Sequence, residues 1–567
     1  MTKKLKFATA ILRIIMKDFG YFGKCEIPLS DEIEVISSAS NEELKEDFLI
    51  SNNEGLKAEI YAPEIDYFLA NSQENALNKA KMVLKLYEAR ALAFDSSNQQ
   101  DYEKAVGKNV LVIAANERVG LKELLASNGF KAIFLDEIDF IYGCVGELSA
   151  IIDDDGKKLE VECDFALFSS PKDWALRQSG CYDISALSDD EIIKILTKSS
   201  PKHSYKNHIF YENEPCLYHQ KRVEICAKCV EICPRVAILK NSEAKELEFS
   251  AIDCIGCGSC VSICPSGAID NAVISRSAFN KIAKNYAGFT PLVLLENSLP
   301  NLPLKEGILP FIIPNAKMLD FEHLLSLALG VRGAVILHLP EYAKVTLDAI
   351  KLANEIFLKR FNKPLIYISK SQEELQKIQN LDFSDKLEFF EFFEIGKKYE
   401  LIANKLELIT NGMDLGEFEV AGGFENGKIE INESKCTLCA ACAAACNTGA
   451  LIADVSQNAI VFNESLCVGC EYCIKSCAEE GTMSITKDKI TLNSEFFALK
   501  ILAKDELFAC LECGKEFATK KSVERVANML KANFAGDELK IKSLYCCSDC
   551  KAKLALQNQI LKGDFDE

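Results

Sequence analysis

The spacing of the cysteines constrains this chain more than any other feature. Residues 254–265 place four cysteines as C-x2-C-x2-C-x3-C followed by proline, and residues 436–446 and 467–477 repeat the spacing without the proline. A partial copy, C-x2-C-x3-C-P, occupies residues 226–234. Soft thiolates on tight loops of small residues are the ligands that iron–sulfur clusters need. The chain is therefore expected to fold around metal centres as well as around hydrophobic cores.

The pattern occurs twice at a fixed distance along the chain. Cys226 recurs as Cys439 and Cys264 recurs as Cys477, both 213 positions later, with the five cysteines between them in register. Each copy resembles a bacterial 2[4Fe–4S] ferredoxin domain, and a chain with two copies resembles a polyferredoxin-type protein. The resemblance implies two α+β ferredoxin-like dicluster modules and four [4Fe–4S] clusters.

The same resemblance implies that the ligands of each cluster come from both half-motifs. In the first copy it assigns Cys254, Cys257 and Cys260 with Cys233, and, for the neighbouring cluster, Cys226, Cys229 and Cys264. In the second copy it assigns Cys436, Cys439 and Cys442 with Cys477, and Cys467, Cys470 and Cys473 with Cys446.

One ligand of the first copy departs from the family pattern. Val223 stands where the first half-motif should open with cysteine. Cys216, ten residues before Cys226, is the natural substitute, reached by a longer loop that carries His219. The alternative is a cluster held by three cysteines, whose open iron beside His219 could bind a substrate.

The C-terminal region carries two further C-x2-C pairs. These predicted metal ligands are Cys510, Cys513, Cys547 and Cys550, with Cys546 as an alternative. Four thiolates from two tight turns suit a tetrahedral structural Zn²⁺, and the pattern resembles a zinc ribbon with a long helix, residues 521–532, between its knuckles. Rubredoxin-like iron would use the same ligands. We expect zinc here, with iron or no metal as alternatives.

Composition limits the compartment and the partners. The chain has 567 residues, 25 cysteines and a formal net charge of −19. An odd cysteine count at metal-ligand spacings predicts a reducing, cytoplasmic setting, and residues 1–6 are expected to begin a strand or helix rather than a signal peptide. Without an apolar run of membrane-spanning length, we expect no membrane insertion. The excess of acidic residues argues against a nucleic acid as partner. It favours redox partners with basic surfaces, or it serves solubility alone.

The chain divides into five expected domains. These are an N-terminal α/β domain (1–205), the first ferredoxin domain (206–285), a central α/β domain (286–400), the second ferredoxin domain (401–495) and the C-terminal double C-x2-C domain (496–567). In the N-terminal domain we expect a helix over 74–91, a strand over 110–114, and a hairpin turning at 153–156. Its dispersed cysteines, Cys25, Cys144, Cys163 and Cys181, are expected to be buried structural thiols rather than a fifth metal site.

Strand and helix alternate in the central domain. Apolar runs of strand length cover 292–295, 309–313, 334–337 and 365–368, and helical spacing covers 321–329 and 345–361. This order predicts a parallel sheet with helices on both faces. Residues 307–339 resemble the small iron–sulfur subunit of methyl-viologen-type hydrogenase and heterodisulfide reductase systems, but this stretch has no cysteine.

The G-x4-G-K match at 422–428 does not predict a phosphate-binding loop. Ile429 replaces the hydroxyl residue that would hold Mg²⁺, and residues 418–420 and 428–431 alternate as strands. The sequence predicts a β-hairpin here, turning at Asn426 and Gly427.

These patterns predict an electron-transfer protein rather than an independent enzyme. The four-cluster build resembles accessory iron–sulfur proteins of formate dehydrogenase or hydrogenase systems, which implies redox proteins as partners. Two alternatives are a redox enzyme subunit with an open cluster site, and an assembly factor that uses its metal centres as folding staples.

Overall fold

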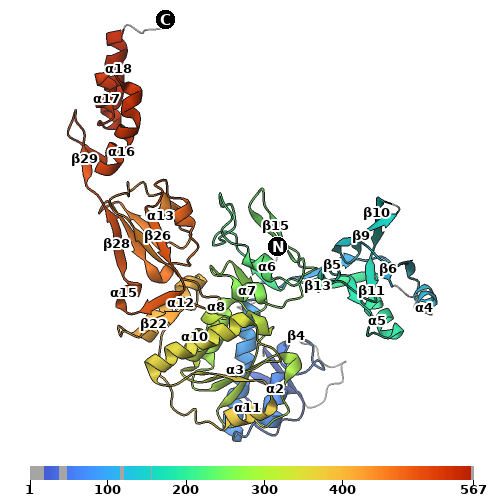
Figure 1. The fold of residues 1–567 in the computed structure, drawn as a ribbon. Coiled ribbons are helices and arrows are strands. Elements are labelled where there is room, and N and C mark those ends of the chain that lie inside the picture. The colour runs from blue at the N-terminus through green and yellow to red at the C-terminus, as the bar shows by residue number, and fades with distance from the viewer. Residues whose placement is uncertain (1–17, 37–47, 115–119, 155, 563–567) are drawn as a thin grey trace.

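The structure is a computed structural model that describes residues 18–36, 48–114, 120–154 and 156–562. The expected strand or helix at residues 1–6 lies outside the described residues. Figure 1 shows a central body from which two parts project: the strands and helices between β5 and β13 on one side, and helices α16 to α18 on the other. Every helix of the described ranges is too short or too polar to cross a lipid bilayer.

The central sheet is parallel, as the alternating pattern predicts. Its strands are β18 (Thr290–Leu294), β19 (Ile308–Ile312), β20 (Val335–His338) and β21 (Ile366–Ser369), in the order β19-β18-β20-β21. The main helices are α8 (Arg276–Asn285), α9 (Phe321–Val331), α10 (Lys344–Phe361) and α12 (Lys398–Thr410). All residues of β18 and β19 are buried, which requires cover on both faces of the sheet.

The N-terminal strands form a second parallel sheet, and in both sheets the first strand along the chain lies between the second and the third. They are β1 (Phe19–Phe22), β2 (Ile33–Ile36), β3 (Phe48–Ser51) and β4 (Ala58–Tyr61), ordered β2-β1-β3-β4 and followed by α2 (Glu64–Asn71) and α3 (Ala76–Asp95). Buried side chains from Phe19 to Ala93 share one hydrophobic core with side chains from Ile274 to Phe496. At this junction Lys85 Nζ donates to the carbonyl oxygen of Asn285 at 2.9 Å.

Residues 101–206 leave and rejoin the body through a two-stranded neck. β5 (Asp101–Ala105) and β13 (Lys202–Lys206) pair antiparallel, and Tyr102 stacks on Tyr205 (Figure 1). The expected domain over 1–205 therefore does not coincide with one core. The reason is that α2 and α3 bury their apolar faces against the central body, whereas residues 106–196 form cores of their own.

The projecting part contains a third parallel sheet and an antiparallel one. The parallel sheet is β7-β6-β11-β12, from β6 (Asn109–Ile113), β7 (Lys131–Leu135), β11 (Phe165–Phe168) and β12 (Cys181–Asp183). Its flanking helices are α4 (Leu121–Ser127) and α5 (Asp189–Ser199). β8 (Phe140–Cys144), β9 (Glu147–Asp154) and β10 (Lys157–Cys163) form the antiparallel sheet, and the pairing of β9 with β10 confirms the predicted hairpin.

Both cysteine-rich regions have the order strand, helix, strand, strand, helix, strand. The first consists of β14 (Ile209–Tyr211), α6 (Lys228–Ile232), β15 (Ile238–Asn241), β16 (Glu246–Phe249), α7 (Ser259–Ile263) and β17 (Ile269–Asn271). The second consists of β23 (Lys428–Ile431), α13 (Ala441–Ala445), β24 (Leu451–Asp454), β25 (Ala459–Asn463), α14 (Tyr472–Lys475) and β26 (Met483–Thr486). In each, the first strand pairs antiparallel with the last and the middle strands form a hairpin. We call residues 209–271 module 1 and residues 428–486 module 2.

The predicted hairpin over 418–431 is wrong. β22 (Gly416–Glu419) pairs with β27 (Lys489–Leu492), whereas β23 pairs with β26. The connecting loop lies close to other elements, because a Cβ on Gly423 would come within 2.2 Å of the Ser262 carbonyl oxygen. A strand follows this loop, so the glycines serve close packing and not phosphate binding.

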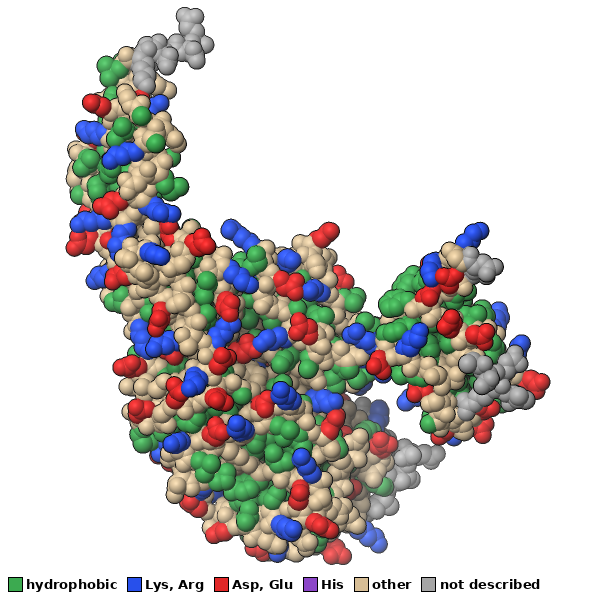
Figure 2. Space-filling model, in the orientation of Figure 1, with side chains coloured by type: hydrophobic (Ala, Val, Ile, Leu, Met, Phe, Trp, Pro, Cys, Tyr) green, Lys and Arg blue, Asp and Glu red, His purple; other side chains and the backbone are tan. Residues whose placement is uncertain are grey.

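The C-terminal region projects from module 2 as an arm. β28 (Leu499–Lys504) extends the hairpin of module 2 into a three-stranded sheet. β29 (Leu507–Ala509) and β30 (Glu516–Thr519) then lead to α16 (Lys520–Leu530), α17 (Glu538–Ser543) and α18 (Ser548–Lys562). On the face shown in Figure 2, acidic and basic side chains are interspersed over both the arm and the central body.

Candidate metal centres

The cysteine loops of the complete motifs share an unusual backbone. Residues on both sides of the second cysteine have positive φ in all three: Gly256 and Gly258, Leu438 and Ala440, and Gly469 and Glu471. A left-handed conformation costs a non-glycine residue about 1–2 kcal/mol, so the non-glycine positions need compensation from their surroundings. The conformation turns the loop around a common centre, as a loop that supplies several ligands to one cluster must.

In each module, one cavity is lined by the cysteines of a predicted ligand set. The cavity of module 1 has Cys233 together with Cys254, Cys257 and Cys260 on its walls. The cavity of module 2 has Cys436, Cys439, Cys442 and Cys477 on its walls. The fourth cysteine comes from the other half-motif in both cases, which agrees with the crossed sets that the ferredoxin resemblance implies.

Cys216 lies with the cysteines of the second set in module 1. It is buried in the same core as Cys229 and Cys264. Burial, and then the neighbouring Cys264 thiol, raise the pKa of Cys226 to about 11, and Cys216 acts in the same direction. Cys216 therefore lies near the other three cysteines of this predicted set, whereas Val223 is exposed.

The last set joins Cys446 to the motif that starts at Cys467. Burial, followed by the thiols of Cys467 and Cys470, raises the pKa of Cys473 to about 12, and Cys446 contributes as well. Cys467 has a pKa of about 12, mainly because of its burial.

The chemistry of these sets fits a metal centre. Burial and mutual repulsion both disfavour several thiolates at one place when no cation is bound. Bound metal reverses this balance, since it deprotonates the thiols that coordinate it and offsets their charge. The four sets could therefore each hold one [4Fe–4S] cluster.

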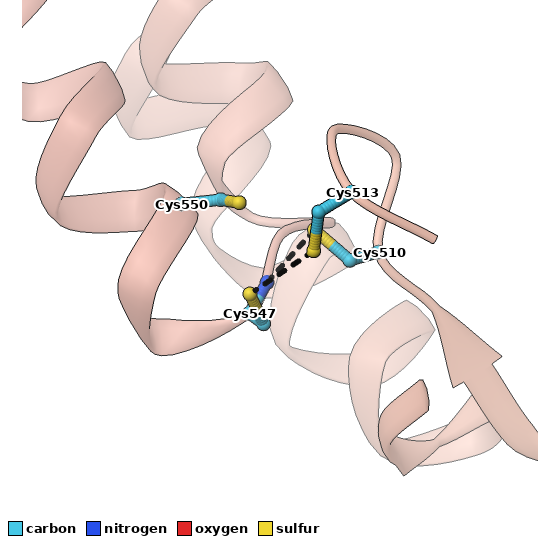
Figure 3. Close-up of side chains that lie close together, drawn as sticks. All are labelled: Cys510, Cys513, Cys547 and Cys550. Atoms are coloured by element: carbon cyan, nitrogen blue, oxygen red, sulfur yellow. Dashed lines mark hydrogen bonds between the residues drawn. The ribbon is translucent and has the colours of Figure 1, made fainter. Parts of the chain in front are cut away.

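The C-terminal cysteines converge more tightly. The sulfurs of Cys510, Cys513, Cys547 and Cys550 all lie within 4.8 Å of one another (Figure 3). Four sulfurs at about 2.3 Å from one ion would lie about 3.8 Å apart, and the Cys513–Cys547 Sγ separation is 3.7 Å. Burial opposes ionisation of Cys510, but backbone N–H groups, among them that of Cys547 at 3.3 Å, lower its pKa to about 6. This arrangement suits one tetrahedral ion.

Cys546 is not part of this group. Its Sγ lies 3.3 Å from the carbonyl oxygen of Lys542 and donates to it.

Two of the dispersed N-terminal cysteines are buried thiols, as expected: Cys163 and Cys181 lie in a hydrophobic core. Cys144 is half-buried and accepts a hydrogen bond from Lys104 Nζ at 3.1 Å.

The two modules contact each other beside two of the predicted ligand sets, that of Cys216 and that of Cys446, which we call the inner sets. Leu217, Tyr399 and Val468 form a small apolar cluster, against which Cys226 of module 1 and Cys470 of module 2 both pack. The amide of Asn447 also donates to the carbonyl oxygen of Cys216 at 3.3 Å. One ligand candidate from each module thus contacts the same few side chains.

A network of buried charged side chains lies beneath module 1, and the cysteine motifs in the sequence do not predict it. Lys398 is fully buried, and its Nζ donates to the carbonyl oxygen of Cys264 at 2.8 Å and forms an ion pair with Asp320 at 2.8 Å. Burial disfavours the Asp320 carboxylate, but Arg276 and Lys398 hold its pKa well below the usual value.

Asp320, Glu322 and His323 lie close enough together to suggest a cation site. Arg276, Lys398 and Lys405 already pair with the two carboxylates, so the group is a buried salt-bridge network.

Comparison with known protein families identifies both modules. Residues 224–269 and residues 428–478 each match a family model described as a 4Fe-4S dicluster domain. The first match begins after Cys216, so that cysteine lies outside the family pattern. A search of the curated proteins finds no match. The chain thus contains two 4Fe–4S dicluster ferredoxin domains within a larger protein of mixed α/β structure.

Proposed function

We propose that the protein is a cytoplasmic electron-transfer protein in which four [4Fe–4S] centres form one relay. The observation that carries the proposal is the apolar cluster shared by Cys226 and Cys470, because it joins the inner ligand sets of the two modules. Bound [4Fe–4S] clusters supply one-electron redox chemistry whose potential depends on burial, local charge and hydrogen bonds to sulfur.

The ligand sets suggest an order for this relay. The set of Cys254 lies at one end and that of Cys216 follows it in module 1. The set of Cys446 comes next across the apolar cluster, and the set of Cys436 is last. In the last set Cys439 is exposed, which offers a place where a redox protein could approach. We infer from the family resemblance that formate dehydrogenase or hydrogenase systems could supply such partners.

The C-terminal arm is proposed to bind Zn²⁺ as a structural staple. The tight sulfur spacing supports a single ion, and a structural zinc contributes folding free energy directly. Cys513→Ala should abolish zinc binding and unfold the arm, while Cys546→Ala should leave both unchanged. Metal analysis with circular dichroism checks this. Iron in place of zinc would make the arm a fifth redox centre.

The relay is tested by anaerobic reconstitution. We expect iron and acid-labile sulfide each near ~16 atoms per chain, from four clusters of four. Redox titration followed by electron paramagnetic resonance should give reversible signals from interacting centres at low potential. Centres that are reduced only as the protein unfolds would instead indicate folding staples.

A further inference from the structure

A large cleft lies between module 1 and the central parallel sheet. Its volume is about 990 Å³, near the upper end of the usual range for small-molecule sites. Its walls come from β4 and α3, from the neck, from the cysteine loop of module 1, and from the loops that follow β18, β19 and β20.

The position of the cleft in the sheet indicates a ligand site. The strand order β19-β18-β20-β21 reverses between β18 and β20. Ligands of open parallel sheets bind beyond the carboxyl ends of the strands at such a reversal, and the flavodoxin-like order 2-1-3-4-5 binds flavin mononucleotide there. Glu296 follows β18, Asn315 follows β19 and Glu341 follows β20, and all three line this cleft.

One wall of the cleft belongs to a predicted cluster site. Ile255, Gly256 and Cys257 face the cleft, and Cys257 also lines the cavity of the first ligand set. Two side chains pack closely against the glycines of this loop. The ring of His208 lies 2.8 Å from where a Cβ on Gly256 would be, and Asn315 Oδ1 would be closer still to a Cβ on Gly258. A ligand in the cleft would thus lie beside the cysteine loop of the Cys254 set, which packs closely against Asn315 at the sheet edge.

The polar lining favours a ring with few fixed charges. Arg90 is already held by Glu64 in a two-point ion pair at 2.6 and 2.8 Å. Lys317 pairs with Glu341 at 3.0 Å, and this carboxylate is 62% exposed, so the lysine can exchange it for a ligand anion at little cost. Lys206 pairs in the same way with the exposed Asp101. The remaining walls combine apolar side chains, among them Val273, Leu295 and Ile313, with polar ones such as Glu296 and Asn315.

We propose that this cleft binds the isoalloxazine ring of a flavin, which exchanges electrons with the centre of the Cys254 set. This inference rests on the proposed relay and adds the site at which electrons enter it. A reduced flavin anion would give up two electrons, one at a time, to two oxidised clusters of the relay, and its N–H proton to water at the open side of the cleft. Two clusters each gain one electron, and the flavin returns to its oxidised form.

The test uses the full-length, cluster-loaded protein under anaerobic conditions, titrated with flavin mononucleotide and with riboflavin. We expect saturable quenching of flavin fluorescence at one site per chain. Val273→Trp should fill the cleft and weaken binding about tenfold or more, whereas the matched variant Val455→Trp, at a site 84% exposed, should bind as the wild type does. Retention of the cluster absorbance shows that both variants are folded.

Tighter binding of the mononucleotide than of riboflavin would assign its phosphate to Lys206 and Lys317, and equal affinities would assign recognition to the ring alone. Unsaturable quenching in the wild-type protein, or equal binding by Val273→Trp, would overturn the inference. Transfer between the modules is measured with a small chemical reductant and no flavin, so a failure of the relay is distinguished from a failure of this site.

Discussion

The two modules share one pattern of elements but differ in their surroundings. Module 1 lies against the central body, draws one candidate ligand, Cys216, from outside its motif, and has the buried Lys398 beneath it. Module 2 has two complete motifs and carries the arm on an extended sheet. The difference predicts that a cluster in module 1 is adjusted by its surroundings, whereas the predicted ligand sets of module 2 come entirely from its own complete motifs.

The sharpest contrast is between Cys216 and its counterpart Cys436. If Cys216 is a full ligand, Cys216→Ala and Cys436→Ala should each lose one centre, or up to ~4 of about 16 iron atoms per chain. Iron and sulfide analysis after identical reconstitution measures this, with Cys25→Ala as the control that loses none. Full iron content in Cys216→Ala alone would restore the three-cysteine alternative for module 1.

The next contrast concerns buried charge. Lys398→Met removes the ammonium from Asp320 and from the Cys264 carbonyl, and breaking a buried pair costs about 3–5 kcal/mol. The free energy of unfolding should fall by that order, and one centre should shift to lower potential because a nearby positive charge is lost. Lys475→Met, at an exposed position of module 2, should leave the free energy of unfolding nearly unchanged and should shift a potential less, because solvent screens its charge. Equal effects of the two variants on the free energy of unfolding and on the potential would contradict this difference between the modules.

The smallest expected effect is at Tyr211. Burial, and then a side-chain hydrogen bond with Cys216, raise the pKa of its hydroxyl, and its ring packs against the core of Cys216 and Cys264. We expect the hydroxyl to donate to sulfur when the centre is formed, which stabilises the reduced state. Tyr211→Phe should therefore lower the midpoint potential of one centre only. Tyr218→Phe, whose hydroxyl donates to the Asn241 carbonyl, should leave all potentials unchanged.

Local patterns in the sequence predict much of this fold. Strand-length apolar runs predict the parallel central sheet, because strands buried on both faces lack polar alternation. The family pattern predicts a cysteine at the position of Val223, so the valine there indicates that another cysteine, Cys216, is the replacement ligand. Contacts between distant segments leave no such pattern. Three examples join residues far apart in the chain: the pairing of β22 with β27, the packing of α2 and α3 onto the central body, and the contact of Lys398 with Asp320.

The relay across the modules is tested most directly at Val468. This side chain is buried in the apolar cluster against which Cys226 and Cys470 pack, so Val468→Lys should force a charge into the contact and separate the inner sets. With one module reduced first, rapid-freeze electron paramagnetic resonance follows the arrival of electrons in the other. The account predicts much slower arrival in Val468→Lys than in the wild type or in the exposed control Val455→Lys, with full iron content in all three. Unchanged transfer in Val468→Lys, or modules that do not exchange electrons in the wild type, would contradict it.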